Sequence, residues 1–138
     1  MPMIDLIRRI QRGEAPLPPI LATLGIALLD AEPGAARVAY TVSPRHFNAM
    51  GTLHGGILCD LADVAMGFAY AAALAEGETF TTAELKINYL RPIRDGRLVA
   101  SARVVHDGRT LALVECDVCD QTGKLVARAS SSCMKLAP

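Results

Sequence analysis

The second half of the chain alternates apolar and polar residues, and short turn signals separate the alternating segments. The turn signals are the dipeptides Asp95-Gly96, Asp107-Gly108 and Thr122-Gly123. The alternating segments are residues 81–90, 97–106, 110–119 and 124–136. Alternation with a period of two, interrupted by turn dipeptides, predicts four antiparallel strands joined by hairpins.

The first third of the chain contains one amphipathic segment followed by two shorter strand patterns. Residues 3–12 predict a helix, and its apolar face consists of Met3, Leu6, Ile7 and Ile10. We expect this helix to end at the prolines that follow it, which are Pro16, Pro18 and Pro19. Residues 1–20 would then be an N-terminal helix and a proline-rich lead-in. Residues 25–30 and 35–43 predict two strands separated by Glu32-Pro33-Gly34.

Residues 55–75 break the strand pattern. This run is rich in alanine, contains no proline and is too long for one strand, so it predicts a helix. It is apolar on nearly all sides, as in a buried helix or a membrane span. Asp60 and Asp63 would each cost about 2.5–3.5 kcal/mol near the centre of a bilayer, so we expect no membrane span. The fold expected is α+β, a single domain over residues 1–138 with a curved antiparallel sheet wrapped around one long central helix.

Charge and composition exclude several kinds of partner. The 138 residues include 14 Lys and Arg and 14 Asp and Glu, so positive charge is not in excess. Non-specific binding of nucleic acid or anionic membranes depends on clustered positive charge. Aromatic residues make up 4%, which argues against stacking platforms for single-stranded nucleic acid. The N-terminus lacks the long apolar core of a signal peptide, and we expect a cytoplasmic protein.

Cys116 and Cys119 form a C-x-x-C pattern, which in other contexts binds metal or carries redox chemistry. Here the pattern lies within a predicted strand, where residues three apart point to opposite faces. No second pair completes a zinc set, and the three histidines, His46, His54 and His106, lack ligand spacing. We therefore expect four reduced cysteines and no metal.

The start of the long helix carries the residues with the clearest chemistry. Gly55 and Gly56 allow close backbone approach, and the first N–H groups of a helix have no partner within it. Together with the positive end of the helix dipole, these amides suit a carbonyl oxygen that gains negative charge. Asn48 and His54 add side-chain donors, and Asp63 supplies a base or nucleophile. The combination predicts acyl transfer to water.

Two stretches of the sequence resemble a known family. They run from Phe47-Asn48 through Leu53-His54-Gly55-Gly56 to Leu61-Ala62-Asp63, and along Glu84-Leu-Lys-Ile-Asn-Tyr-Leu-Arg-Pro92. These motifs closely resemble the hotdog-fold thioesterases of the phenylacetate-pathway (PaaI-like) type, over about residues 20–136. The resemblance implies a hotdog fold and hydrolysis of acyl- or aryl-coenzyme A thioesters. It also implies a homodimer or a dimer of dimers (a homotetramer) with sites at the subunit interface.

The resemblance assigns roles to five residues. The Gly55 N–H would polarise the thioester carbonyl, Asn48 would position the carbonyl or the attacking water, and His54 would orient the thioester end. Asp63 would act as general base or nucleophile, at a site completed by the other subunit. Thr82 lies where many relatives carry a hydroxyl that helps to hold the water.

Strict alternation assigns the neighbours of Thr82 to the two faces of the strand. Thr82 would share its face with Glu84, Lys86 and Asn88. The face that packs on the helix would hold Ala83, Leu85, Ile87 and Tyr89. Thr81 is the alternative to Thr82, because a slip of one residue exchanges the two faces.

Coenzyme A carries phosphates, which bind cations or free amides. Arg91, Arg94 and Arg109 lie at predicted strand ends or turns, and Arg109 with Thr110 is the preferred phosphate contact. Gly56 is expected to lie against the substrate. Coenzyme A is itself part of the substrate, so we expect no cofactor.

Two other functions stay open at this point. Hotdog dehydratases that act on 3-hydroxyacyl thioesters use a histidine before the central helix and an acidic residue on it, and His46 and Asp60 have about that spacing. Against this reading, His54-Gly55-Gly56 replaces the proline-glycine helix entry of those enzymes. The second alternative is a non-catalytic acyl-CoA-binding module. Sensors of that kind carry a DNA-binding helix-turn-helix, which the roughly twenty residues before the first strand cannot supply.

Overall fold

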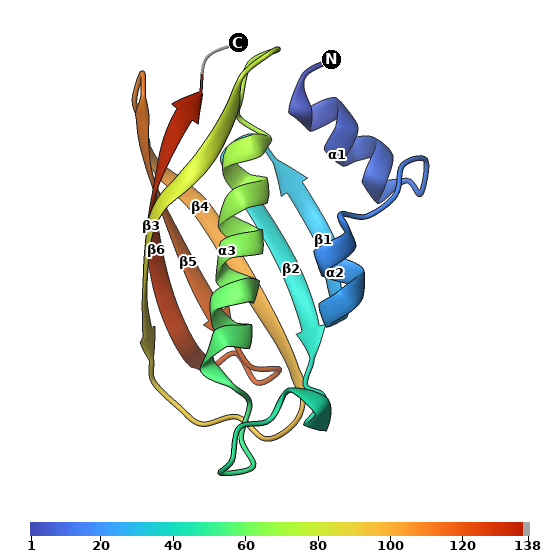
Figure 1. The fold of residues 1–138 in the computed structure, drawn as a ribbon, viewed down its shortest axis with the longest axis vertical. Coiled ribbons are helices and arrows are strands. Elements are labelled where there is room, and N and C mark those ends of the chain that lie inside the picture. The colour runs from blue at the N-terminus through green and yellow to red at the C-terminus, as the bar shows by residue number, and fades with distance from the viewer. Residues whose placement is uncertain (137–138) are drawn as a thin grey trace.

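A curved six-stranded antiparallel sheet wraps around one long helix (Figure 1). The computed structural model describes residues 1–136, so the last two residues of the expected domain lie outside the described residues. The helices are α1 (Met3–Gln11), α2 (Pro19–Leu24) and α3 (Gly55–Ala71), with a 3-10 turn, η1 (Pro44–His46). The strands are β1 (Ile26–Glu32), β2 (Ala35–Thr41), β3 (Thr79–Tyr89), β4 (Arg97–Asp107), β5 (Leu111–Cys119) and β6 (Leu125–Leu136). The predicted α+β architecture is confirmed.

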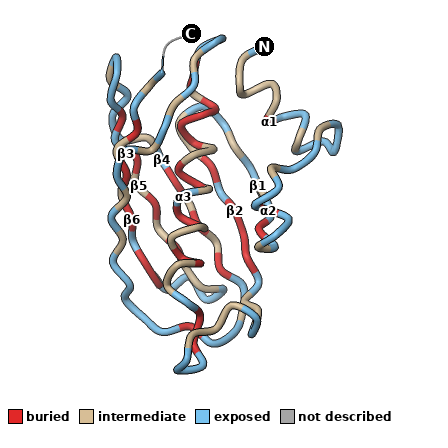
Figure 2. The backbone as a smooth tube through the Cα atoms, viewed as in Figure 1, coloured by how far each residue is buried: buried red, intermediate tan, exposed pale blue. Residues whose placement is uncertain are grey.

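Helix α3 forms the centre of the core, and buried residues on the helix and on the strands beside it alternate with less buried ones (Figure 2). Its fully buried residues include Leu61, Ala62, Ala65 and Ala69. Alanine adds no bulk beyond Cβ, so the strands approach the helix closely, while a buried leucine contributes about 1.5–3 kcal/mol. The helix ends at Ala71 rather than at residue 75, because the chain turns there towards β3. Within residues 1–136, no helix is both long enough and apolar enough to cross a membrane.

The strands follow the order β1-β2-β4-β5-β6-β3 across the sheet. The predicted hairpins β4–β5 and β5–β6 are confirmed. The predicted hairpin between β3 and β4 is wrong, because β3 pairs with β6 while β4 lies between β2 and β5. The connection over residues 90–96 is longer than the two to about five residues of a hairpin loop. It crosses the end of the sheet and leaves β3 as an edge strand.

Strand β3 contains a bulge that changes which side chains face the helix. Its pairing with β6 shifts between Thr82, opposite Cys133, and Glu84, opposite Ser132. Ala83 is the extra residue and is exposed, so the prediction that it packs on the helix is wrong. An extra residue reverses the alternation of faces. Thr82 therefore faces the helix, whereas strict alternation placed it on the outer face with Glu84.

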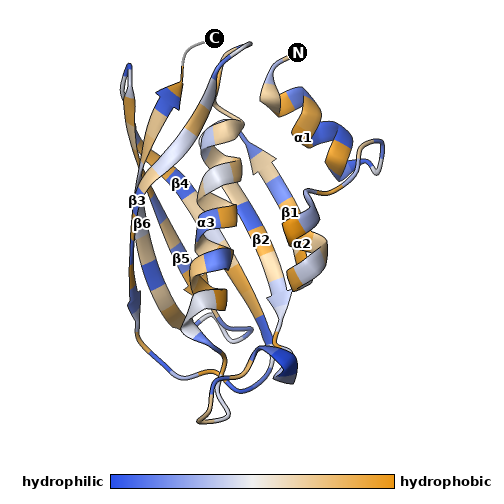
Figure 3. Cartoon of the chain, in the orientation of Figure 1, coloured by the Kyte–Doolittle hydropathy of each residue, from blue (hydrophilic) through white to orange (hydrophobic). Residues whose placement is uncertain are grey.

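Helix α1 carries both strongly hydrophobic and strongly hydrophilic residues (Figure 3), as predicted for an amphipathic helix. Ile7 on its apolar face is buried against the last turn of α3. The helix ends at Gln11 and not at the prolines, because Gly13 turns the chain with a φ of 74°. Pro19 instead is the first residue of the short helix α2, which the sequence pattern did not predict. Proline suits a first helical position, where its missing N–H is not needed.

Candidate active site

Helix α3 begins at two glycines whose backbone amides are free. His54 precedes the helix in an extended conformation, and its side chain forms no capping hydrogen bond. The N–H of Ile57 donates to the His54 carbonyl at 3.0 Å. Within the described chain, the N–H groups of Gly55 and Gly56 have no acceptor. Two donors therefore lie at the positive end of a 17-residue helix, where they favour a polarised or anionic oxygen.

The loop before α3 is held by the side chain of Asn48. Its Oδ1 accepts hydrogen bonds from the backbone N–H groups of Met50, at 2.9 Å, and Thr52, at 3.2 Å. Its Nδ2 donates to Thr52 Oγ1 at 2.9 Å. One of the two Nδ2 hydrogens is thus engaged within the loop. Asn48 shapes the approach to the helix and has one side-chain hydrogen left for a substrate.

Two aromatic rings lie against the two glycines. A Cβ on Gly56 would lie 2.8 Å from His54 Nε2, and a Cβ on Gly55 would lie 3.0 Å from Tyr89 Cζ. Neither position accommodates a larger residue unless the ring moves. His54 is itself exposed, so its imidazole lies between the helix start and solvent. The structure brings His54 next to both glycines.

Tyr89 belongs to this site, although strict alternation predicted only that it packs on the helix. Its hydroxyl donates to the Gly55 carbonyl oxygen at 3.1 Å and lies 3.1 Å from Cys59 Sγ. The hydrogen bond with Cys59 and partial burial raise the pKa of Tyr89 to about 12, so the hydroxyl keeps its proton at neutral pH. No local sequence pattern identifies this role, because Gly55 lies 34 positions away along the chain.

Asp63 lies two turns further along α3, on its exposed side. Thr82 Oγ1 lies 3.5 Å from Asp63 Oδ1, at the outer limit of a hydrogen bond. Although Asp63 is open to solvent on one side, desolvation by the surrounding protein raises its pKa, and the Thr82 hydroxyl opposes that shift. The bulge in β3 is what turns Thr82 towards the carboxylate. The structure thus brings these two predicted residues together.

Asp60 lies one turn before Asp63 and close to two histidines. Desolvation and the charge of Asp63 raise the pKa of Asp60, whereas His54 and His46 lower it. His46 Nδ1 lies 2.5 Å from the hydroxyl oxygen of the buried Tyr40, so one ring nitrogen is engaged by the core. Of the pair considered for a dehydratase, His46 thus has its Nδ1 engaged by Tyr40, and Asp60 lies one turn from Asp63 on the same helix.

The glycine amides and Asp63 are too far apart to act on one carbonyl within a single chain. They are eight residues apart, from 55 to 63, which is about 12 Å along a helix that rises 1.5 Å per residue. A reacting carbonyl needs its hydrogen-bond donor and its base each within about 3 Å. The described chain therefore holds two half-sites. We call them the glycine half-site, at Gly55 and Gly56, and the aspartate half-site, at Asp63 and Thr82.

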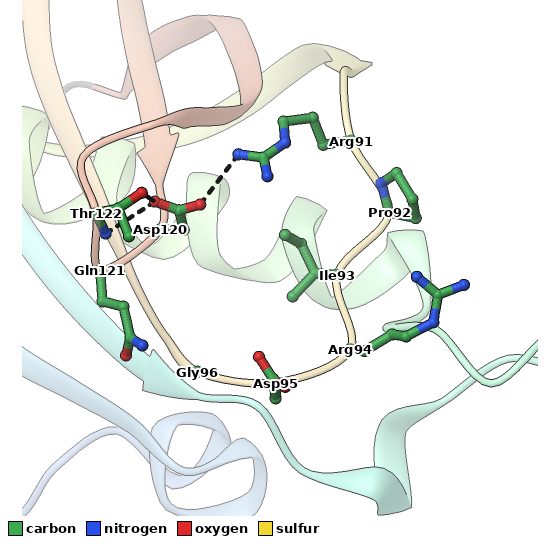
Figure 4. A pocket seen from close by; sticks show the side chains of 9 residues that line it. All are labelled: Arg91, Pro92, Ile93, Arg94, Asp95, Gly96, Asp120, Gln121 and Thr122. Atoms are coloured by element: carbon green, nitrogen blue, oxygen red, sulfur yellow. Dashed lines mark hydrogen bonds and ion pairs between the residues drawn. The ribbon is translucent and has the colours of Figure 1, made fainter.

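An open groove of about 380 Å³ runs from the glycine half-site along the connection between β3 and β4. Its lining includes Asn48, Gly55, Tyr89 and Arg91. A second hollow of about 220 Å³ adjoins the groove, because Arg91 lines both. In Figure 4, Arg91 reaches across this hollow to Asp120, with 3.0 Å between Nη1 and Oδ2. The structure thus places Arg91 near the glycine half-site.

Arg109 and Thr110 lie at the opposite end of the sheet. They precede β5, and the Thr110 carbonyl accepts a hydrogen bond from the N–H of Lys135, near the end of β6. Tyr89 is paired with Ala127, towards the other end of β6. The eight residues between these two points of β6 span roughly 27 Å at about 3.4 Å per residue. Within one chain, the structure does not bring Arg109 and Thr110 to the glycine half-site.

Cys116 and Cys119 differ in exposure, as expected for opposite faces of a strand. Cys116 is buried, Cys119 is partly exposed, and all four cysteines are free thiols. Burial raises the pKa of the Cys116 thiol to about 12, which leaves it unreactive at neutral pH. Among residues 1–136, no group of three or more histidine, cysteine, aspartate or glutamate side chains is placed to hold a metal ion.

The chain is similar to known thioesterases in sequence and in structure. Residues 50–127 match the profile of the thioesterase superfamily. Human acyl-coenzyme A thioesterase 13 is 34% identical over 105 residues, which are 75% of this chain and 74% of that protein. Thioesterase HI1161 from Haemophilus influenzae superposes with a TM-score of 0.81 at 25% identity, covering 86% of this chain and 82% of that chain. A mutant of the phenylacetic acid degradation protein PaaI from Thermus thermophilus superposes with a TM-score of 0.80 at 32% identity, covering 86% of this chain and 100% of that chain. The hotdog fold expected from the sequence is confirmed.

Proposed function

This chain belongs to the thioesterase superfamily and is a thioester hydrolase, and from that premise we propose that it hydrolyses acyl- or aryl-coenzyme A thioesters. The observation that carries the proposal is the pair of free amides at Gly55 and Gly56, which open onto the groove of about 380 Å³. The names of the human and Thermus relatives, an acyl-coenzyme A thioesterase and a phenylacetic acid degradation protein, support this substrate class. The products are the free acid and coenzyme A, and the reaction needs no resident cofactor. Four free thiols support a reducing, cytoplasmic location.

In the proposed reaction, the thioester oxygen accepts hydrogen bonds from the N–H groups of Gly55 and Gly56. Negative charge develops on this oxygen as the tetrahedral adduct forms, and the helix dipole stabilises it together with the amides. One donor of this kind contributes a factor of about 10²–10³ to the rate. His54 lies over Gly56 and orients the thioester end of the substrate. Asn48 adds its remaining Nδ2 hydrogen to the carbonyl or to the attacking water.

Asp63 is proposed to act as general base or as nucleophile. Its raised pKa makes the carboxylate a stronger base than an ordinary aspartate. In the first route Asp63 takes a proton from a water that attacks the carbonyl carbon. In the second route a carboxylate oxygen of Asp63 attacks the carbonyl carbon and forms a mixed anhydride with the acyl group, and water then hydrolyses this anhydride. In both routes the C–S bond breaks and the leaving thiolate is protonated to free coenzyme A, while Thr82 helps to hold the water.

A second copy of the chain completes the site in this proposal. The two half-sites of one chain lie about 12 Å apart, and β3, which contributes to both, is an edge strand of 11 residues. An edge of this length is a template for pairing with another chain. If two copies pair their β3 strands antiparallel about a two-fold axis, the aspartate half-site of one lies beside the glycine half-site of the other. We propose a homodimer with two shared sites, which can associate further as a dimer of dimers.

The phosphates of coenzyme A are proposed to bind along the groove at Arg91. The Asp120 carboxylate holds the Arg91 side chain across the neighbouring hollow and so limits its motion. Arg109 and Thr110 lie at the far end of the same chain, so they would contact only a substrate that is held by another copy.

Free-thiol release tests the proposed function. A panel of acyl- and aryl-coenzyme A substrates is incubated with wild type, Asp63→Asn or the control Asp5→Asn, which lies on α1 away from both half-sites. Because Cys59 and Cys119 are partly exposed, dithiobis-nitrobenzoate is added only to samples already quenched in denaturant, and the thiols of the enzyme itself are subtracted as a blank. We expect release by wild type and the control, with kcat about 10²–10⁴-fold lower in Asp63→Asn and little change in KM. Absence of release from every substrate would contradict the proposal.

A further inference from the structure

We propose that Tyr89 is a positioning residue in the wall of the groove, which fixes and polarises the Gly55–Gly56 peptide through its carbonyl oxygen. The inference rests on the proposed function, in which the amides of these glycines hold the thioester oxygen. Tyr89 is 51% exposed, so it adds little to the hydrophobic core. Its polar contacts are instead with the first turn of α3, at Gly55 and Cys59.

The direction of the hydrogen bond to Gly55 follows from the chemistry of the two groups. The Gly55 carbonyl, at 3.1 Å, can only accept, so the Tyr89 hydroxyl donates to it. The Cys59 thiol also lies 3.1 Å from the Tyr89 oxygen, and either atom of that pair can donate.

The hydrogen bond from Tyr89 ends on the peptide group that carries a proposed oxyanion donor. The Gly55 carbonyl and the Gly56 N–H belong to the same peptide unit. A hydrogen bond to the oxygen draws electron density from the nitrogen, and the N–H becomes a stronger donor. In a regular helix this carbonyl accepts only from the N–H four residues later. The Tyr89 hydroxyl adds a second donor.

The ring of Tyr89 also sets the position of Gly55. Its Cζ, Oη and Cε1 atoms lie 3.0, 3.1 and 3.2 Å from the place that a Cβ on Gly55 would occupy. The ring thus packs against the Gly55 Cα and limits its movement towards β3. Because the hydroxyl proton is given to Gly55, Tyr89 has none for the substrate. It acts through the glycine half-site and not on the reacting atoms.

Tyr89→Phe tests the proposal, because it removes the hydroxyl and keeps the ring. We expect kcat to fall about 3- to 10-fold, with KM and the unfolding temperature unchanged. Thr41→Val, which removes an exposed hydroxyl from β2, is the control and should keep wild-type kcat. Cys59→Ala should change kcat less than Tyr89→Phe does. The double variant should equal Tyr89→Phe alone, because Cys59 acts only through the Tyr89 oxygen.

A spectroscopic measurement separates polarisation from a merely structural role. The carbonyl stretch of a ¹³C-labelled thioester is recorded by difference infrared spectroscopy, bound to Asp63→Asn and to Asp63→Asn with Tyr89→Phe. We expect a higher frequency without the hydroxyl, because the carbonyl is less polarised. An unchanged frequency together with wild-type kcat in Tyr89→Phe would overturn the proposal. This measurement needs only a bound thioester, so it still tests Tyr89 if wild type releases no thiol, which would contradict the proposed function instead.

Discussion

Replacing Gly55 by alanine should separate the stability of α3 from its proposed chemistry. The new methyl group would lie 3.0 Å from Tyr89 Cζ and 3.1 Å from its hydroxyl oxygen. Carbon atoms prefer separations of about 3.5–4.0 Å, so the ring must move by several tenths of an ångström. It can do so because Tyr89 is half exposed. The movement stretches the hydrogen bond to the Gly55 carbonyl and displaces the amide.

The stability change should be small because two contributions oppose each other. Alanine is favoured over glycine inside a helix by up to about 1 kcal/mol, and by less at the first position. Weakening the hydroxyl–carbonyl hydrogen bond costs about 0.5–1.5 kcal/mol. The rate should change more. Removing an oxyanion donor costs a factor of about 10²–10³, and for a displaced donor we expect about 10–100, which is about 1.4–2.7 kcal/mol of barrier.

Thiol-release kinetics and thermal unfolding of the same preparations test this separation. Gly67→Ala is the matched control on the same helix, because its added Cβ would lie 3.8 Å from Phe80 Cζ, an ordinary contact. We expect Gly67→Ala to keep wild-type kcat and to be slightly more stable. Wild-type kcat in Gly55→Ala would refute the role of the Gly55 amide. Unfolding of Gly55→Ala at a much lower temperature would refute the balance of stability contributions.

Three further predictions concern the charged groups. Thr82→Val removes the hydroxyl that lowers the pKa of Asp63, so the acid limb of the kcat–pH profile should move to higher pH. An acid limb at the wild-type pH would show that the Thr82 hydroxyl does not affect the pKa of Asp63. The pKa of Asp63 is raised in the folded chain, so its ionised form destabilises the fold. Asp63→Asn should therefore unfold at a higher temperature than wild type at pH 7, and the gain should vanish below about pH 4; a lower temperature at pH 7 would contradict this. Thr122 is the main cause that lowers the pKa of Asp120 to about 2, and Arg91 adds to it. Asp120→Asn should lower the unfolding temperature at pH 7, and the deficit should shrink between about pH 4 and pH 2. Equal unfolding temperatures of Asp120→Asn and wild type at pH 7 would contradict a stabilising role for the hydrogen bonds of Asp120 with Thr122 and Arg91.

Local patterns predicted the elements of the fold because each depends on residues close in sequence. Turn dipeptides located the hairpins β4–β5 and β5–β6, and the apolar run from Gly55 located α3. These local patterns did not predict the order of the strands in the sheet. Strand β3 pairs with β6, whose residues come from the far end of the chain, and residues 90–96 form a crossing and not a hairpin. Such pairing depends on how α3 and the sheet pack.

The candidate site could be predicted where helix geometry fixes the spacing of residues. Gly55, His54 and Asp63 belong to one helix and its cap, so their order along the axis follows from the sequence. Thr82 was predicted on the wrong face, because the bulge beside it arises from pairing with β6. The hydrogen bond from Tyr89 to Gly55 joins residues 34 positions apart, and no local pattern signals it.

In the proposed dimer, two copies of the chain share each thioesterase site, to which one copy contributes the Gly55 amide and the other contributes Asp63. Co-expression of Gly55→Ala and Asp63→Asn chains under two different affinity tags, followed by purification of the doubly tagged dimer, tests this arrangement directly. That dimer regains one intact site of its two, so its thiol-release rate should be about half that of wild type. A rate no higher than the average of the two separate variants would contradict the shared site.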